Sequence, residues 1–201
     1  MSYLGRKYSV RFDPRLTVTG QTLAVSFENH RNNIMIRLEK FTKEMYSDLI
    51  SWIGNAEELM LFAGPKLTFP LTNEQLNESL NETGRFAFQV VNQNDNLPIG
   101  HCEIYLTNNT AALGRILIGE KSFRGKGLGK IIVKKLLKYI EENIDRKKVE
   151  LNVFDFNIAA IKCYEKVGFK INLDKKSERI VNGKKWIALN MTLDLENKPN
   201  G

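Results

Sequence analysis

Apolar side chains recur at every second position in several short stretches of this chain, which is the spacing of a half-buried β-strand. The predicted strands cover residues 35–41, 86–91, 98–106, 110–120, 148–154, 169–171 and 186–195. Apolar positions three or four residues apart predict helices over 43–53, 56–62, 73–80, 128–144 and 158–166. Short turns between strands favour antiparallel pairs, and the one strand–helix–strand crossover favours a parallel pair. The pattern predicts an α/β (α+β) fold with a mixed, mostly antiparallel sheet.

Residues 1–34 differ from the rest of the chain. Apolar and polar residues alternate at Tyr8, Val10 and Phe12, and turn signals follow, so a short β-ribbon is one interpretation. A disordered leader, or an upstream segment joined to the domain, is the other. The rest of the 201-residue chain is long enough for one domain with a sizeable core. We expect that domain to cover residues 35–195 and a flexible polar tail to cover residues 196–201.

A glycine-rich turn joins a predicted strand to the longest predicted helix. Gly125, Gly127 and Gly129 would each destabilise a helix interior by about 1 kcal/mol relative to alanine, so the backbone there must serve another purpose. A turn of this kind at a helix N-terminus presents free backbone N–H groups and the positive end of the helix dipole, which suit phosphate. The spacing fits neither the P-loop, where Gly127 replaces Ser or Thr, nor the dinucleotide fingerprint, where Lys130 replaces the third glycine.

Composition narrows the possible functions. The net charge is +7, but Lys and Arg are scattered and no block of five like charges occurs, which argues against nucleic acid as a partner. No apolar run could cross a bilayer and no signal peptide follows Met1, so we expect a cytoplasmic protein with no membrane partner. Cys102, Cys163, His30 and His101 have no metal-ligand spacing, and no metal site is expected.

Two motifs in this chain resemble those of a known family. The turn of residues 124–129 resembles the pyrophosphate loop of the GCN5-related N-acetyltransferases, the GNAT family, whose pattern is Arg/Gln-x-x-Gly-x-Gly/Ala after a β-strand. Residues 157–169 resemble the second signature of that family, and residues 52–65 look like the N-terminal helices of its ribosomal-protein and polyamine acetyltransferase subgroup. The resemblance covers residues 35 to about 193. It implies the GNAT fold, with helices on both faces of the sheet.

The resemblance also implies how acetyl-CoA, the expected co-substrate, would bind. Backbone N–H groups of the turn would hold the pyrophosphate, and the side chains of Arg124 and Lys130 would add positive charge. The preceding strand would pair its backbone with the pantetheine arm, and one of its N–H groups would polarise the thioester carbonyl. The implied cofactor-binding residues are Ile116, Leu117, Ile118, Arg124, Gly125, Lys126, Gly127, Leu128, Gly129, Lys130 and Asn157. Asn157 could instead be a helix N-cap with no further role.

Two residues are candidates for catalysis. In the family, the tyrosine that matches Tyr164 protonates or hydrogen-bonds the CoA sulfur, and the alternative is a tyrosine packed in the core. Glu103 is expected to share one face of its strand with Ile99 and His101, away from the apolar face. It is therefore a candidate general base, with His101 as a second candidate. The alternative for Glu103 is a structural carboxylate paired with Arg115.

The expected function is therefore N-acetylation, in which a neutral primary amine attacks the acetyl group of acetyl-CoA directly. A function of a different class, an acyl-CoA-binding sensor without turnover, is the alternative. The sequence leaves the acceptor open between a small molecule and a peptide amine. It also leaves open whether the chain forms a homodimer.

Overall fold

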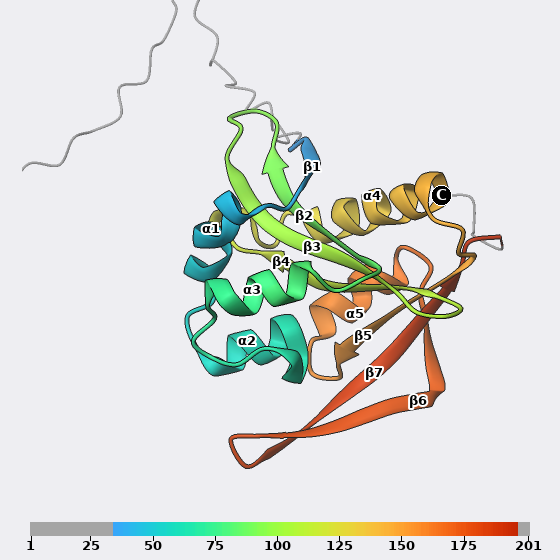
Figure 1. Ribbon diagram of the computed structural model, residues 1–201. Coiled ribbons are helices and arrows are strands. Elements are labelled where there is room, and N and C mark those ends of the chain that lie inside the picture. The colour runs from blue at the N-terminus through green and yellow to red at the C-terminus, as the bar shows by residue number, and fades with distance from the viewer. Residues whose placement is uncertain (1–33, 197–201) are drawn as a thin grey trace, which may run out of the picture. The chain divides into compact units, whose positions relative to one another are not determined.

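A computed structural model describes residues 34–196, so the predictions for the leader and the tail fall almost entirely outside the described residues. Its centre is a seven-stranded sheet in the order β1-β2-β3-β4-β5-β7-β6 (Figure 1). The strands are β1 (Ile36–Lys40), β2 (Arg85–Asn92), β3 (Pro98–Leu106), β4 (Ala111–Ile118), β5 (Lys148–Phe154), β6 (Lys170–Val181) and β7 (Lys184–Asp194). β4 and β5 are parallel and the other neighbouring pairs are antiparallel. The predicted mixed sheet with one parallel pair is confirmed.

Helices cover both faces of this sheet, which is also confirmed. One face carries α1 (Tyr46–Ser51), α2 (Ala56–Ala63) and α3 (Asn73–Leu80), with the short 3₁₀ turns η1 (Lys43–Met45) and η2 (Gly64–Lys66). The other face carries α4 (Leu128–Asn143), preceded by η3 (Lys121–Phe123), and α5 (Ile158–Glu165). α4 follows its four-residue apolar spacing, because Leu128, Ile132, Leu136 and Ile140 are all fully buried against the sheet.

The hairpin of β6 and β7 is longer than predicted. Asn182 and Gly183 form its turn with φ of +50° and +75°, the conformation that favours Asn-Gly at a two-residue hairpin turn. β6 nevertheless runs through residues 172–181, which we expected to be a loop. Most of these residues are charged or polar and exposed, so no apolar alternation marks them as a strand. Backbone pairing with β7 holds Asn172 and residues 176–181 extended, and residues 173–175 form an irregularity in the register.

Two further observations concern the described residues alone. No helix within residues 34–196 is long and apolar enough to cross a membrane. In the same range, no group of three or more His, Cys, Asp and Glu side chains is arranged to hold a metal ion. Cys102 is buried and Cys163 is half-buried, and both are free thiols.

Candidate functional site

β4 and β5 pair over only part of their length. Residues 111–113 of β4 lie beside residues 149–151 of β5, whereas residues 114–118 of β4 have no β5 partner in the described part of the chain. On its other edge, β4 continues to pair with β3 as far as Ile118. The last five residues of β4 therefore keep one free backbone edge, on the side where β5 has separated. Such an edge can hydrogen-bond an extended chain laid beside it.

The glycine-rich turn follows this strand after the short turn η3. Gly125 and Gly127 have φ of +75° and +79°, and a Cβ added at either would meet nothing within 4 Å. Glycine is needed there for backbone conformation and not for space. None of the N–H groups of residues 125–129 donates a hydrogen bond to another described residue. They converge on the N-terminus of the 16-residue helix α4, so this loop offers an anion both free donors and the helix dipole.

Arg124 makes hydrogen bonds within the chain that differ from its expected contacts with pyrophosphate. Its backbone N–H donates to the Lys121 carbonyl oxygen at 3.1 Å, so this amide is not among the free ones. Its side chain donates from Nε to the Ile118 carbonyl oxygen at 2.8 Å and from Nη2 to the Gly119 carbonyl oxygen at 3.3 Å. Arg124 therefore ties the end of β4 to the loop. The exposed side chain of Lys130 has no such bond to a described residue.

α5 lies against the last glycine of the same loop. The Asn157 side-chain oxygen accepts a hydrogen bond from the Ala160 N–H at 3.2 Å, which confirms the N-cap interpretation. α5 packs closely on the first turn of α4, because a Cβ on Gly129 would lie 3.2 Å from Cys163 Sγ. The third glycine of the turn thus allows two helices to approach, which is a packing role.

Tyr164 lies two turns into α5, next to Cys163. Its half-buried ring meets the Phe169 ring edge-on, with centroids 6.2 Å apart. Burial raises the pKa of its hydroxyl to about 12. No side chain or backbone group among residues 34–196 is hydrogen-bonded to that hydroxyl. It therefore stays protonated at neutral pH and is available as a proton donor.

Glu103 is a buried, salt-bridged carboxylate. It is only 2% exposed, it pairs with Arg85, and its Oε1 lies 3.2 Å from Arg115 Nη1. His101 Nε2 lies 2.9 Å from the same oxygen and donates to it, because an ionised carboxylate can only accept. Burial alone would raise the pKa of Glu103, but the His101 hydrogen bond and the two arginines outweigh it and lower the pKa to about 2. The pairing with Arg115 is the structural alternative stated above.

His101 and Ile99 also differ from expectation. His101 is 1% exposed and its ring meets the Phe41 ring edge-on, with centroids 4.4 Å apart, so it has no open path to a substrate amine. Ile99 does not share the face of Glu103. β3 carries one extra residue between its pairs with Val90 and Val91, and this bulge turns Ile99 into the apolar cluster under α4.

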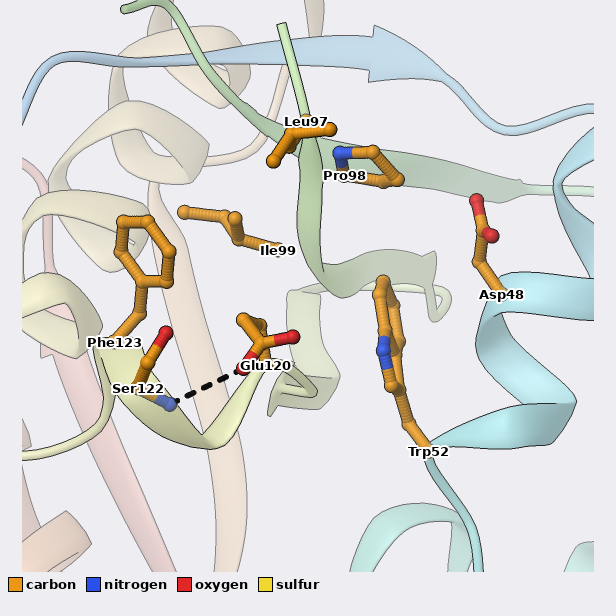
Figure 2. Close-up of a pocket in the computed structure, with 8 residues that line it drawn as sticks. All are labelled: Asp48, Trp52, Leu97, Pro98, Ile99, Glu120, Ser122 and Phe123. Atoms are coloured by element: carbon orange, nitrogen blue, oxygen red, sulfur yellow. Dashed lines mark hydrogen bonds between the residues drawn. The ribbon is translucent and has the colours of Figure 1, made fainter. Parts of the chain in front are cut away.

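A pocket of about 340 Å³ opens where β3 begins and β4 ends (Figure 2). Its lining residues are Asp48, Trp52, Leu97, Pro98, Ile99, Glu120, Ser122 and Phe123. Asp48 Oδ2 accepts from Gln89 Nε2 at 2.9 Å, and Glu120 Oε1 accepts from the Ser122 N–H at 3.3 Å. Neither carboxylate is ion-paired with a basic side chain in the described range, and the Trp52 ring stands between them. Sequence reasoning did not connect Asp48 and Trp52 with Glu120, because only the fold brings α1 to the end of β4.

Comparisons with known proteins agree with this architecture. The family model described as "Acetyltransferase (GNAT) family" matches residues 47–169. Over 76 residues the chain is 37% identical to a spermine/spermidine N(1)-acetyltransferase of Bacillus subtilis (strain 168). That match covers 37% of this chain and 49% of the relative, so it spans about half the length of the curated protein.

Solved structures share the fold. The chain is similar to spermidine N-acetyltransferase from Vibrio cholerae in complex with CoA and spermine, with a TM-score of 0.68 and 20% identity, over 80% of this chain and 96% of that one. It is also similar to an aminoglycoside acetyltransferase in complex with coenzyme A, with a TM-score of 0.62 and 18% identity, over 81% and 96% of the two chains.

Proposed function

We propose, because this chain belongs to the acetyltransferase (GNAT) family, that it transfers the acetyl group of acetyl-CoA to a primary amine of a small polyamine. The observation that carries the proposal is that the free N–H groups of residues 125–129 follow the free edge of β4 closely along the chain, after the short turn η3. CoA presents an anionic pyrophosphate next to an extended pantetheine arm that carries amide groups. The loop suits the first part and the strand edge suits the second.

In this proposal the backbone at the end of β4 binds the cofactor, while the side chains of the same residues pack in the core. The side chains of Ile116 and Ile118 pack against the cluster under α4, and Leu117 packs against the cluster under α1–α3. Their backbone groups on the β5 side remain for pantetheine, apart from the Ile118 carbonyl oxygen, which accepts from Arg124 Nε. The Asn157 Nδ2 group can donate to the same arm while Oδ1 caps α5. Lys130 adds positive charge beside the pyrophosphate.

The transfer requires a C–N bond to form and the C–S bond of the thioester to break. The neutral amine nitrogen attacks the acetyl carbon, and the electron pair of the C–S bond leaves with sulfur. We assign Tyr164 as the donor of the proton that sulfur gains, since its raised pKa keeps it protonated. The low pKa of Glu103 and its three partners support a structural role, so this mechanism uses no proton transfer to it. The nitrogen loses its proton to water.

A polyamine acceptor is supported by the relatives and by one feature of the site. The curated relative is named for spermine and spermidine, and the Vibrio cholerae structure contains spermine. In this chain, the pocket with Asp48, Glu120 and Trp52 provides two carboxylates without basic partners and an aromatic face, which suit a second ammonium group. A single-amine acceptor would leave these groups unused.

Thiol release from acetyl-CoA in a panel of amines tests the proposal. We expect release with spermidine and spermine to exceed that with kanamycin or with a peptide N-terminus. Asp48→Asn combined with Glu120→Gln should raise the KM for spermidine and leave the KM for acetyl-CoA unchanged. A chain that binds acetyl-CoA but releases no thiol with any amine would favour the sensor alternative.

A further inference from the structure

β4 carries an extra residue just beyond the point where it leaves β5. His101 and Glu103 of β3 pair with Leu117 and Gly114 of β4, so two steps along β3 correspond to three steps along β4. Arg115 lies in this bulge with φ of +49°. That conformation is unfavourable for any residue with a Cβ, and it persists only where the surroundings hold it in place.

The surrounding residues hold Arg115 through its side chain. It is 5% exposed, and its Nη1 donates to Ser79 Oγ of α3 at 2.6 Å and to Glu103 Oε1 at 3.2 Å. Its guanidinium group lies 5.9 Å from the centre of the Phe62 ring of α2. The bulge is thereby attached to the neighbouring strand and to two helices on the α1–α3 side of the sheet.

Glu103 is itself fixed. Arg85 of β2 binds Oε2 of its carboxylate, and His101 of β3 binds Oε1. Arg85 in turn pairs with Glu82 at 2.5 Å and lies over the Tyr105 ring at 4.3 Å. A carboxylate with this many donors keeps a single position, so the partner that it offers Arg115 does not move.

The anchored conformation of Arg115 affects the direction of the backbone groups at the free edge of β4. The φ and ψ angles of Arg115 set the plane of the peptide group that carries the Ile116 N–H, because that peptide group follows directly. Bulges re-aim the residues next to them. A different conformation at Arg115 would turn this N–H and shift the following free edge relative to β5.

We propose that Arg115, anchored by Glu103 and Ser79, is a positioning residue that holds the β4 bulge and so aims the Ile116 N–H at the thioester carbonyl of acetyl-CoA. The inference rests on the proposed function. It assigns the buried ion network a task in the reaction without any contact between that network and the substrate.

The test measures the NMR resonance of the acetyl carbonyl carbon in ¹³C-labelled acetyl-CoA. The labelled acetyl-CoA is bound to the full chain, and no amine is present. In the wild type, a hydrogen bond from Ile116 should move the carbonyl resonance away from its position in free acetyl-CoA. Arg115→Met removes both side-chain hydrogen bonds and should return the resonance most of the way. The same variant should lower kcat by about 10²-fold, which is the effect of losing one donor to the developing oxyanion. Its Kd for CoA should stay within about 3-fold of the wild-type value, because CoA has no acetyl group and this donor does not contact it.

Three further variants separate positioning from stability. Glycine populates positive and negative φ about equally, so Arg115→Gly should fold even if Arg115→Met does not. Without the side-chain anchor nothing would hold the bulge in one conformation, so the carbonyl shift should again be lost. Arg115→Lys keeps a donor and should recover part of the shift. Leu49→Ala opens a cavity in the core under α1–α3 and should lower stability while keeping the full shift.

Each outcome bears on the proposal. A wild-type carbonyl shift that survives in both Arg115→Met and Arg115→Gly would overturn the positioning role and leave the proposed function standing. A wild type that does not bind acetyl-CoA would overturn both. Loss of the shift in the two Arg115 variants, with the shift retained in Leu49→Ala, is the result that we expect.

Discussion

The charge state of Glu103 is decided by its neighbours and not by its position on a strand. Removing a carboxylate from water favours the neutral form, yet two arginines and one histidine bind this group and favour the ion. The group is consequently a poor proton acceptor near neutral pH. Its energetic importance lies in keeping Arg85 and Arg115 paired.

Glu103→Gln should therefore lower the free energy of unfolding by about 3–5 kcal/mol at pH 7, because it leaves buried arginines without their partner charge. The folded-state pKa of Glu103 lies below its ordinary value of 4.5, so this stabilisation is complete above that pH. Urea unfolding of both proteins should show a constant difference from pH 8 to pH 5. The difference should narrow only as the pH falls from about 4.5 toward 2.

Glu39→Gln is the matched control for this effect. Glu39 pairs with Arg37 at 2.7 Å, but both side chains are more than one-third exposed, so the loss should stay below about 1 kcal/mol. An equally small loss in Glu103→Gln would contradict the assigned charge state.

Tyr164 should act through its hydroxyl alone. Tyr164→Phe keeps the ring contact with Phe169, so stability should change by less than about 1 kcal/mol, while kcat falls by about 10²–10⁴-fold. The raised pKa, about 12 against an ordinary 10, means that the acid form persists as the pH rises. In the wild type, kcat should therefore show no decline near pH 10. Tyr139→Phe, a similar change on α4, should leave kcat unaltered, and an equal loss there would remove the case for Tyr164.

At the scale of elements, the glycine-rich loop and the hairpin turn both require a residue with positive φ. We expect only the loop to affect CoA binding. Gly127 and Gly183 have φ of +79° and +75°, and neither has an atom within 4 Å of an added Cβ. Alanine at either position should cost about 1–3 kcal/mol through backbone strain. Isothermal titration calorimetry should show weaker CoA binding in Gly127→Ala and unchanged binding in Gly183→Ala. Equal CoA affinities in the two variants would separate the loop from the cofactor.

Most elements could be predicted from the sequence because their apolar spacing is regular. The limits of β3 and β5 agree with the prediction, and α4 differs from its predicted range by one residue. β6 could not be predicted over its full length, because exposed polar residues carry no apolar alternation and only β7 keeps them extended. Bulges are equally hidden, since an extra residue opposite a partner strand leaves no mark within its own strand.

Some features of the candidate site could likewise be predicted from the sequence, and others could not. Backbone functions, such as the loop of residues 125–129 and the Asn157 cap, follow local glycine and asparagine positions that can be read from the chain. The pairing of Glu103 with Arg85 could not be predicted, because Arg85 comes from the neighbouring strand β2. Alternation places His101 on the same face as Glu103, but it gives no depth of burial. The pocket at Asp48 likewise depends on how α1 packs against the sheet.

At the scale of the whole molecule, the described residues contain two apolar clusters, one on each face of the sheet. All of their buried members lie between Ile36 and Leu193, and Ile34 and Leu195 pack against one cluster at its margins. Both faces of the sheet are therefore covered by helices from within this range. The free edge of β4 and the glycine-rich loop lie inside the same range.

A shortened chain of residues 34–196 should consequently fold as a unit and bind CoA. We expect one cooperative thermal transition with a midpoint within about 4 °C of the full chain, which corresponds to a change of about 1 kcal/mol for a protein of this size. Calorimetric titration should give the same Kd for CoA in both chains, because every group proposed to hold the cofactor is retained. A much lower midpoint would show that residues 1–33 add to the core. A normal midpoint with weakened CoA binding would instead show that they contribute to the cofactor site, and the proposed site would then have to be extended to include them.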